Sequence, residues 1–176
     1  MKKIVFLSII LTILPSFTSC KSTQKKTGCL EGDCNNGRGT YVWKDGSKYF
    51  GMFKINKFHG VGTYIGQDGR KYIGDFVKGK MEGKGTYTWM DGKKYVGEFK
   101  DNIIQGNGII FYPDGTKYEG EFKNRKANGK GIFTWPDGSM YIGEFMDNKM
   151  HGKGKQIFSD GTSLEGQFIN GILIEK

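Results

Sequence analysis

The three cysteines offer the most varied chemistry in this chain. Cys29 and Cys34 lie five residues apart, and Cys20 precedes them. A pair at this spacing can form a disulfide, remain as two buried thiols, or contribute to a redox or metal site. Two strand residues five apart point to opposite faces, so a bridge needs a local turn near Gly32. We expect the disulfide if the chain is exported, and the other two uses stay open.

Residues 1–19 indicate export. They combine the basic start Lys2-Lys3 with small or polar residues before Cys20. Between them lies an apolar run of about eleven residues, well short of the ~20 that a membrane-spanning helix needs. The sequence Phe-Thr-Ser-Cys at 17–20 resembles the lipobox of bacterial lipoproteins, in which the cysteine receives lipid and becomes the new N-terminus. Phe17 replaces the usual leucine, so ordinary secretory cleavage remains the alternative to lipidation of Cys20.

The segment 20–28 is predicted to be a flexible basic tether, because it is polar and carries Lys21, Lys25 and Lys26. Removal of residues 1–19 takes away two lysines and no acid, which lowers the formal charge from +9 to +7. The tether lysines can also contact anionic lipid head groups, at roughly 1 kcal/mol each. Basic charge with interleaved aromatic residues would suit nucleic acid, but export argues against such a partner.

The two histidines do not predict a metal site. His59 and His151 each precede a glycine and lie 92 residues apart, which is four units of a 23-residue repeat. If each unit is a hairpin, the two side chains are ~40 Å apart and cannot share a metal within one chain. We expect both histidines to be turn residues.

The acidic residues do not predict a catalytic pair. Asp75, Glu98, Glu121 and Glu144 recur once per unit, whereas an acid and a base need different environments. No glycine-rich stretch opens a helix, and the clustered acids of calcium-binding repeats are missing. We find no nucleophile beside a base, so the sequence predicts no catalytic residue, no metal and no cofactor.

Composition indicates one small folded domain built from aromatic residues and turns. The chain has 176 residues, 29 of them glycine, with 36% hydrophobic and 14% aromatic content. That is too little Leu and Val for a thick core, while disordered chains usually have few aromatic residues. The core must therefore come from aromatic side chains in regular places.

A repeat with a period of 23 supplies that regularity. Asp-Gly recurs at 45–46, 68–69, 91–92, 114–115, 137–138 and 160–161. A tyrosine follows each of the first five, and Leu164 takes the sixth place; the tyrosines are Tyr49, Tyr72, Tyr95, Tyr118 and Tyr141. A glycine stands two residues after each of these positions and a phenylalanine two residues further on, as in Gly97 and Phe99. Each full unit then carries a Gly-x-Gly pair.

The spacing predicts one β-hairpin per unit. Residues at i, i+2 and i+4 share one face of a strand, as in Tyr95-x-Gly97-x-Phe99 and again in Gly85-x-Tyr87-x-Trp89. Trp-Pro-Asp-Gly at 135–138 fits a type I turn with a left-handed glycine. The other loop carries Asn or Gly in one place, types that tolerate positive φ, and Arg125 breaks that row. We expect the strand glycines to make room for aromatic rings that lean across from adjacent strands.

The pattern Y-x-G-E-F-x(5)-H-G-x-G-x(5)-D-G resembles the MORN (membrane occupation and recognition nexus) repeat. Within a repeat domain at 29–176, the units are a short one at 30–48, full ones at 49–71, 72–94, 95–117, 118–140 and 141–163, and a truncated one at 164–176. The histidine and the glutamate of the pattern are replaced in several units. The resemblance implies an all-β fold, an elongated and twisted antiparallel sheet of tandem hairpins, with no enzyme activity of its own.

Two classes of function fit this reading. The first is a non-catalytic, lipid-anchored scaffold that binds an unidentified protein of the bacterial cell envelope, on its periplasmic or surface face. The second is direct recognition of anionic lipid head groups or of an envelope glycan, which the basic charge favours. The candidate binding row is Tyr49, Tyr72, Tyr95, Tyr118 and Tyr141, about 10 Å apart. We expect their rings to pack on the phenylalanines while their hydroxyls reach water.

Overall fold

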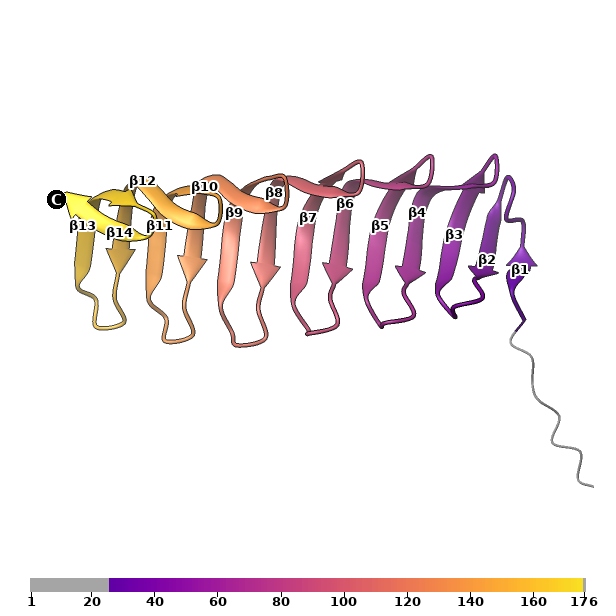
Figure 1. Ribbon diagram of the computed structural model, residues 1–176, viewed down its shortest axis with the longest axis horizontal. Coiled ribbons are helices and arrows are strands. Elements are labelled where there is room, and N and C mark those ends of the chain that lie inside the picture. The colour runs from indigo at the N-terminus through magenta and orange to yellow at the C-terminus, as the bar shows by residue number, and fades with distance from the viewer. Residues whose placement is uncertain (1–25, 176) are drawn as a thin grey trace, which may run out of the picture.

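The computed structural model describes residues 26–175, which form a single open sheet of fourteen strands in sequence order (Figure 1). All neighbouring strands pair antiparallel. The strands are β1 (Gly28–Gly32), β2 (Arg38–Val42), β3 (Lys48–Lys54), β4 (Lys57–Ile65), β5 (Lys71–Val77), β6 (Lys80–Thr88), β7 (Lys94–Lys100), β8 (Ile103–Phe111), β9 (Lys117–Lys123), β10 (Lys126–Thr134), β11 (Met140–Met146), β12 (Lys149–Ile157), β13 (Ser163–Ile169) and β14 (Ile172–Glu175). The predicted all-β sheet of hairpin repeats is confirmed.

The signal peptide predicted at 1–19, the candidate lipidation site Cys20 and most of the tether lie outside the described residues. Strand β1 begins at Gly28, the last residue of the predicted tether. None of the described residues belongs to a helix that is long and apolar enough to cross a membrane.

The Asp-Gly turns have the predicted type I geometry with a left-handed glycine. In the turn between β10 and β11, the Gly138 N–H donates to the Trp135 carbonyl at 3.0 Å, and Gly138 has φ 86°. The Ser139 hydroxyl and backbone N–H both donate to one carboxylate oxygen of Asp137. These bonds hold the pKa of Asp137 below its usual range, the hydroxyl bond having the larger effect.

From β3 onward, the hairpin tips at the other end of the strands are two-residue turns in which both residues have positive φ. This geometry matches the twist of paired strands. Each tip also bonds to the tip before it: the Asn102 N–H donates to the Met81 carbonyl at 3.1 Å, and the Met81 N–H returns a bond to Asn102 Oδ1 at 2.8 Å. Arg125 takes the same left-handed conformation (φ 68°) and keeps the backbone bond, to the Ile104 carbonyl. It therefore interrupts the sequence pattern without interrupting the backbone ladder.

Glycines form an unbroken row across the sheet, one from each strand between β2 and β13. Gly97 of β7, for example, pairs with Gly85 of β6 on one side and with Gly108 of β8 on the other. Beyond this row the register between β7 and β8 shifts. Gly97 pairs with Gly108 but Phe99 pairs with Ile104, so β8 has two more residues than β7 in this interval. Gly106 occupies this bulge with φ 71°. Bulges bend a strand, and Figure 1 shows the hairpin tips bent out of line with the strands.

Candidate functional site

The predicted binding row of tyrosines is buried. Tyr49, Tyr72, Tyr95 and Tyr141 have no exposed surface, and Tyr118 is 3% exposed. Each hydroxyl donates to the backbone carbonyl three residues later, at 2.9–3.1 Å, in the pairs Tyr49–Met52, Tyr72–Asp75, Tyr95–Glu98, Tyr118–Glu121 and Tyr141–Glu144. Burial raises the pKa of Tyr49 and of Tyr95 to about 12. The expectation that these hydroxyls reach water is wrong, so the rings offer no contact surface.

Packing around the glycine row explains this burial. The Tyr95 ring lies over Gly97 of its own strand and Gly108 of the next, where a Cβ atom would come within 2.6 Å of ring carbons. The ring also meets Phe99 and Phe122 edge-on, each with centroids 5.2 Å apart. The Tyr95 ring thus fills the gap over Gly97 of its own strand and leans across to Gly108 of the adjacent strand, so the expected rings from adjacent strands cover the second kind of glycine and not the first. Linked edge contacts of this kind continue from Tyr49 to Phe168.

A second set of aromatic side chains stays partly open on the same face. Each member stands two or four residues after the second glycine of a Gly-x-Gly pair. We call these side chains the open rings, and they are Tyr41, Trp43, Tyr64, Tyr87, Trp89, Tyr112, Phe133, Trp135 and Phe158. Their placement follows from register, since Tyr87 pairs with the buried Tyr72 and Tyr95. The alternation Gly85-x-Tyr87-x-Trp89 in the sequence predicts that these side chains share one face of a strand, but it does not predict that they stay partly open.

Open rings line a central hollow of about 610 Å³ that extends across several repeats. Tyr87, Trp89 and Tyr112 contribute aromatic surface to it, and the hairpin tips contribute Asn102, Asn148 and Arg125. Arg70 and Lys93 also face this hollow, and its lining contains no carboxylate. The Lys93 ammonium group lies 4.4 Å from the centre of the Trp89 ring, a cation–π contact. The hollow therefore combines flat apolar surface with positive charge.

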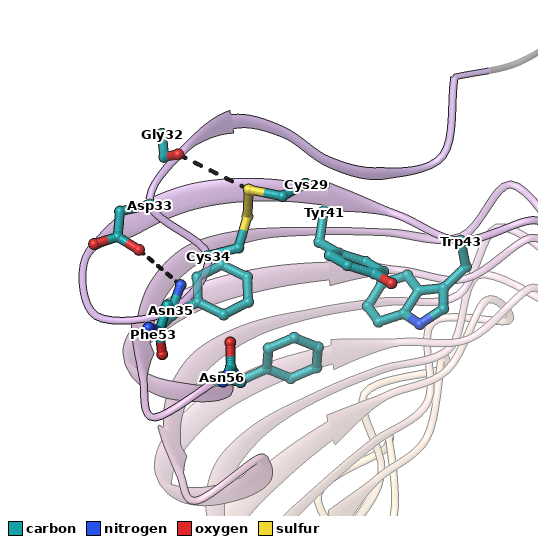
Figure 2. A pocket seen from close by; sticks show the side chains of 10 residues that line it. Cys29, Gly32, Asp33, Cys34, Asn35, Tyr41, Trp43, Phe53 and Asn56 are labelled. Carbon is teal, nitrogen blue, oxygen red and sulfur yellow. Dashed lines mark hydrogen bonds between the residues drawn. A yellow bond between two sulfur atoms is a disulfide. The ribbon is translucent and has the colours of Figure 1, made fainter.

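A second hollow, of about 720 Å³, lies at the N-terminal end of the same face (Figure 2). Tyr41 and Trp43 line it, and its polar groups come from Asp33, Asn35 and Asn56. Cys29 and Cys34 form a disulfide at this hollow, with Cα atoms 5.9 Å apart. The local turn that such a bridge requires is present, because β1 has a bulge after Cys29 and ends at Gly32 with φ 72°.

The repeat pattern itself decides the family. The model of the MORN repeat matches residues 36–48, 49–69, 72–94, 95–117, 118–140 and 141–163. The chain belongs to the MORN repeat family. Its MORN units from 72 onward coincide with the full units expected from the sequence.

One of the similar solved structures supports the fold of these MORN units. The TCP domain of SAS-4 (dCPAP) from Drosophila melanogaster, in complex with a proline-rich motif of Ana2 (dSTIL), matches with a TM-score of 0.53 and 14% identity over 91% of this chain and 86% of that one. A catalytically inactive virginiamycin B lyase from Staphylococcus aureus with quinupristin matches at TM-score 0.20 and 18% identity over 85% of this chain and 44% of that one, too weakly to inform the fold. The comparison with curated proteins finds no match.

The MORN glutamates stabilise the bulges on the opposite face, which we call the outer face. One carboxylate oxygen of Glu121 accepts the Lys130 N–H at 2.9 Å, and Glu98 accepts the Asn107 N–H at 3.3 Å. Beside them the outer face exposes apolar side chains such as Ile73, 42% exposed, and Val96, 37% exposed. Glu98 and Glu121 of the recurring acidic residues thus have a structural role.

The MORN histidines lie within strands β4 and β12, at the same bulges, and the expectation that they are turn residues is wrong. His59 pairs with Met52, and His151 pairs with Glu144. Nδ1 of His151 is buried and has no hydrogen-bond partner in the described part of the chain. Within residues 26–175, no three His, Cys, Asp or Glu side chains are placed together to hold a metal ion.

Proposed function

We propose that this MORN protein is a non-catalytic scaffold, anchored through lipid on Cys20 in a bacterial cell envelope, that holds an extended segment of a partner protein against its open rings. The observation that carries the proposal is the central hollow, where Tyr87, Trp89 and Tyr112 gather beside cationic side chains. Aromatic rings that are partly buried and rigidly held are typical of protein contact surfaces.

The comparisons support binding in general terms. The matched family is a repeat family of the binding-scaffold type, and repeat sheets present extended surfaces to partners. The SAS-4 TCP domain, a similar sheet, is solved with a proline-rich motif of another protein. Aromatic-lined grooves suit such motifs because a proline-rich segment loses little conformational entropy when it binds.

Affinity capture from envelope preparations tests the scaffold. The solubilised protein should retrieve one stoichiometric protein partner, and Trp89→Ala should lose it. Phe111→Ala is the matched control, because Phe111 is an aromatic residue 40% exposed on the outer face. Equal capture of the partner by both variants would show that the open rings are not part of the interface. Mass spectrometry of the mature N-terminus tests the anchor, and an unmodified Cys20 or another start would contradict it.

The outer face favours a second candidate, recognition of anionic lipid or of an acidic envelope glycan. Lysines recur there at one level of the sheet, beside exposed Ile73 and Val96, as Lys48, Lys71, Lys94 and Lys117. A lipid-free protein that sediments with anionic but not zwitterionic vesicles, and loses this in Lys71→Glu with Lys94→Glu, would support lipid recognition. Retrieval of lipid alone from envelopes would favour it over the scaffold.

A further inference from the structure

We propose that the partner segment lies along the open rings as a polyproline II helix, with an apolar residue at every third position and carboxylates where it crosses the central hollow. This inference rests on the proposed scaffold function and specifies its ligand. It depends on two observations: the spacing of the rings along the sheet and the charges around them.

The spacing of the open rings favours one conformation of the bound partner segment. Trp43, Trp89, Tyr112, Trp135 and Phe158 occupy one place in successive repeats, and Gly66 takes that place in the repeat where no ring stands. Neighbouring places are two strand spacings apart, about 9.4–9.8 Å. A polyproline II helix has three residues per turn and rises 3.1 Å per residue, so it repeats every ~9.3 Å. One residue in three can therefore meet one repeat.

Other conformations do not match this spacing. An extended strand brings every second residue to the same side, about 6.7 Å apart, so its side chains lose register with the rings after one repeat. An α-helix repeats every ~5.4 Å and needs two turns, nearly 11 Å, for each hairpin. A polyproline II segment drifts by less than ~0.5 Å per hairpin and stays in register over several of them.

The charges around the central hollow favour a partner segment with acidic residues. Arg70, Lys93 and Arg125 line the central hollow, which has no carboxylate in its lining. Arg125 makes no ion pair with any described residue, Lys93 lies over Trp89, and Arg70 is paired with Asp68 at 3.1 Å. The N-terminal hollow differs, since its lining has Asp33 and no cation. A segment with acids at the central hollow complements this distribution, and one with lysines there does not.

Synthetic peptides test the conformation and the charge separately. The probe is a labelled repeat of Pro-Glu-Ala of about 13 residues, long enough at 3.1 Å per residue to cross four hairpins. Fluorescence anisotropy should show binding of this peptide to the full repeat domain. The same residues in an order without the three-residue period should bind at least about fivefold more weakly, and a Pro-Lys-Ala repeat should not bind measurably.

Arg125→Asn is the variant that isolates the charge. Asparagine occupies the equivalent position in three other tips, at Asn56, Asn102 and Asn148, so the change suits the left-handed backbone and preserves the fold. It should weaken the Pro-Glu-Ala probe by up to about fivefold. Lys130→Asn, which removes the same charge from the outer face, should leave binding unchanged.

The outcomes separate this inference from the scaffold function. Equal binding of the ordered and the permuted peptide, or of the acidic and the basic one, overturns the inference. If an envelope partner is still captured through Trp89 in that case, the scaffold function stands with a different ligand. Binding of polygalacturonate in place of every peptide would assign the central hollow to acidic polysaccharide and overturn both.

Discussion

The hydroxyl of Tyr95 donates a hydrogen bond of 3.0 Å to the backbone carbonyl of Glu98, three residues later in the same strand. The ring of Tyr95 therefore lies flat along β7 and covers the glycine row. The same bond recurs in every full unit, which makes the tyrosine a structural lock. The stability of this MORN sheet should depend on three parts of that arrangement: the hydroxyl, the ring and the glycine beneath it.

Removal of one hydroxyl tests the lock. Tyr95→Phe keeps the ring and leaves the Glu98 carbonyl without its side-chain donor, so the free energy of unfolding should fall by about 1 kcal/mol. Tyr112→Phe is the control, because Tyr112 is 37% exposed, and it should change stability by less than about 0.5 kcal/mol. Urea unfolding measures both. Partner capture by Tyr95→Phe should be normal, and weakened capture would show that the buried row contributes to binding after all.

A methyl group in the glycine row should be costly. Gly108→Ala places a Cβ about 2.6 Å from the Tyr95 ring, so the ring must move and stability should fall by about 1–3 kcal/mol. Asn107→Ala is the neighbouring control on the outer face, where the backbone N–H that bonds to Glu98 is retained. Thermal unfolding followed by circular dichroism compares them. Equal melting temperatures for the two variants would contradict the packing described for Tyr95.

The raised tyrosine pKa values predict loss of stability at alkaline pH. A phenol has a pKa near 10 in the unfolded chain, whereas burial raises that of Tyr49 and Tyr95 to about 12. Below pH 10 both states are protonated and the stabilisation is complete. Above pH 10 the unfolded state loses these protons first, so stability should fall between about pH 10 and 12. Phenolate absorbance from the buried tyrosines and circular dichroism should change together, and ionisation of all nine tyrosines near pH 10 in a still folded protein would disprove this.

Reduction of the disulfide should loosen one end of the sheet only. The bridge between Cys29 and Cys34 closes a short loop, worth about 2 kcal/mol. Strand β1 pairs with β2 alone, and units in a repeat protein contact only their neighbours. Hydrogen exchange at residues 28–32 should accelerate after reduction while exchange in β7 stays constant. Thiol labelling gives the starting state, and two reactive thiols in exported, unreduced protein would show that the bridge is absent there.

Deletion of a whole period should be tolerated better than deletion of a part. Without residues 95–117, Tyr118 follows Lys94 directly and β9 takes the position of β7 beside β6, so the register is restored. This product should fold with a somewhat lower melting temperature. Deletion of 95–106 removes Tyr95 and Phe99 but keeps the rest of β8, and should unfold the protein. Similar circular dichroism and melting for both products would exclude the repeat model.

The spacing of residue types was enough to predict the architecture, because a hairpin repeat is specified by local rules. The spacing of Tyr95, Gly97 and Phe99 shows which residues share a face, and each Asp-Gly fixes a turn through its left-handed glycine. Pairing then needs no long-range information, since every strand contacts the next one in the chain. Period, strands, turns and antiparallel order all follow from those positions.

Which aromatic rings are covered could not be predicted from the sequence and follows from packing between the repeats. Tyr87 and Tyr95 stand side by side in one row and look alike in the sequence, yet Tyr95 is buried and Tyr87 is partly open. The difference arises because the Tyr95 ring turns along its strand onto the glycine row, where Phe99 and Phe122 close over it from two repeats. Burial depends on contacts between units 23 residues apart, and a periodic pattern specifies faces without specifying what covers them.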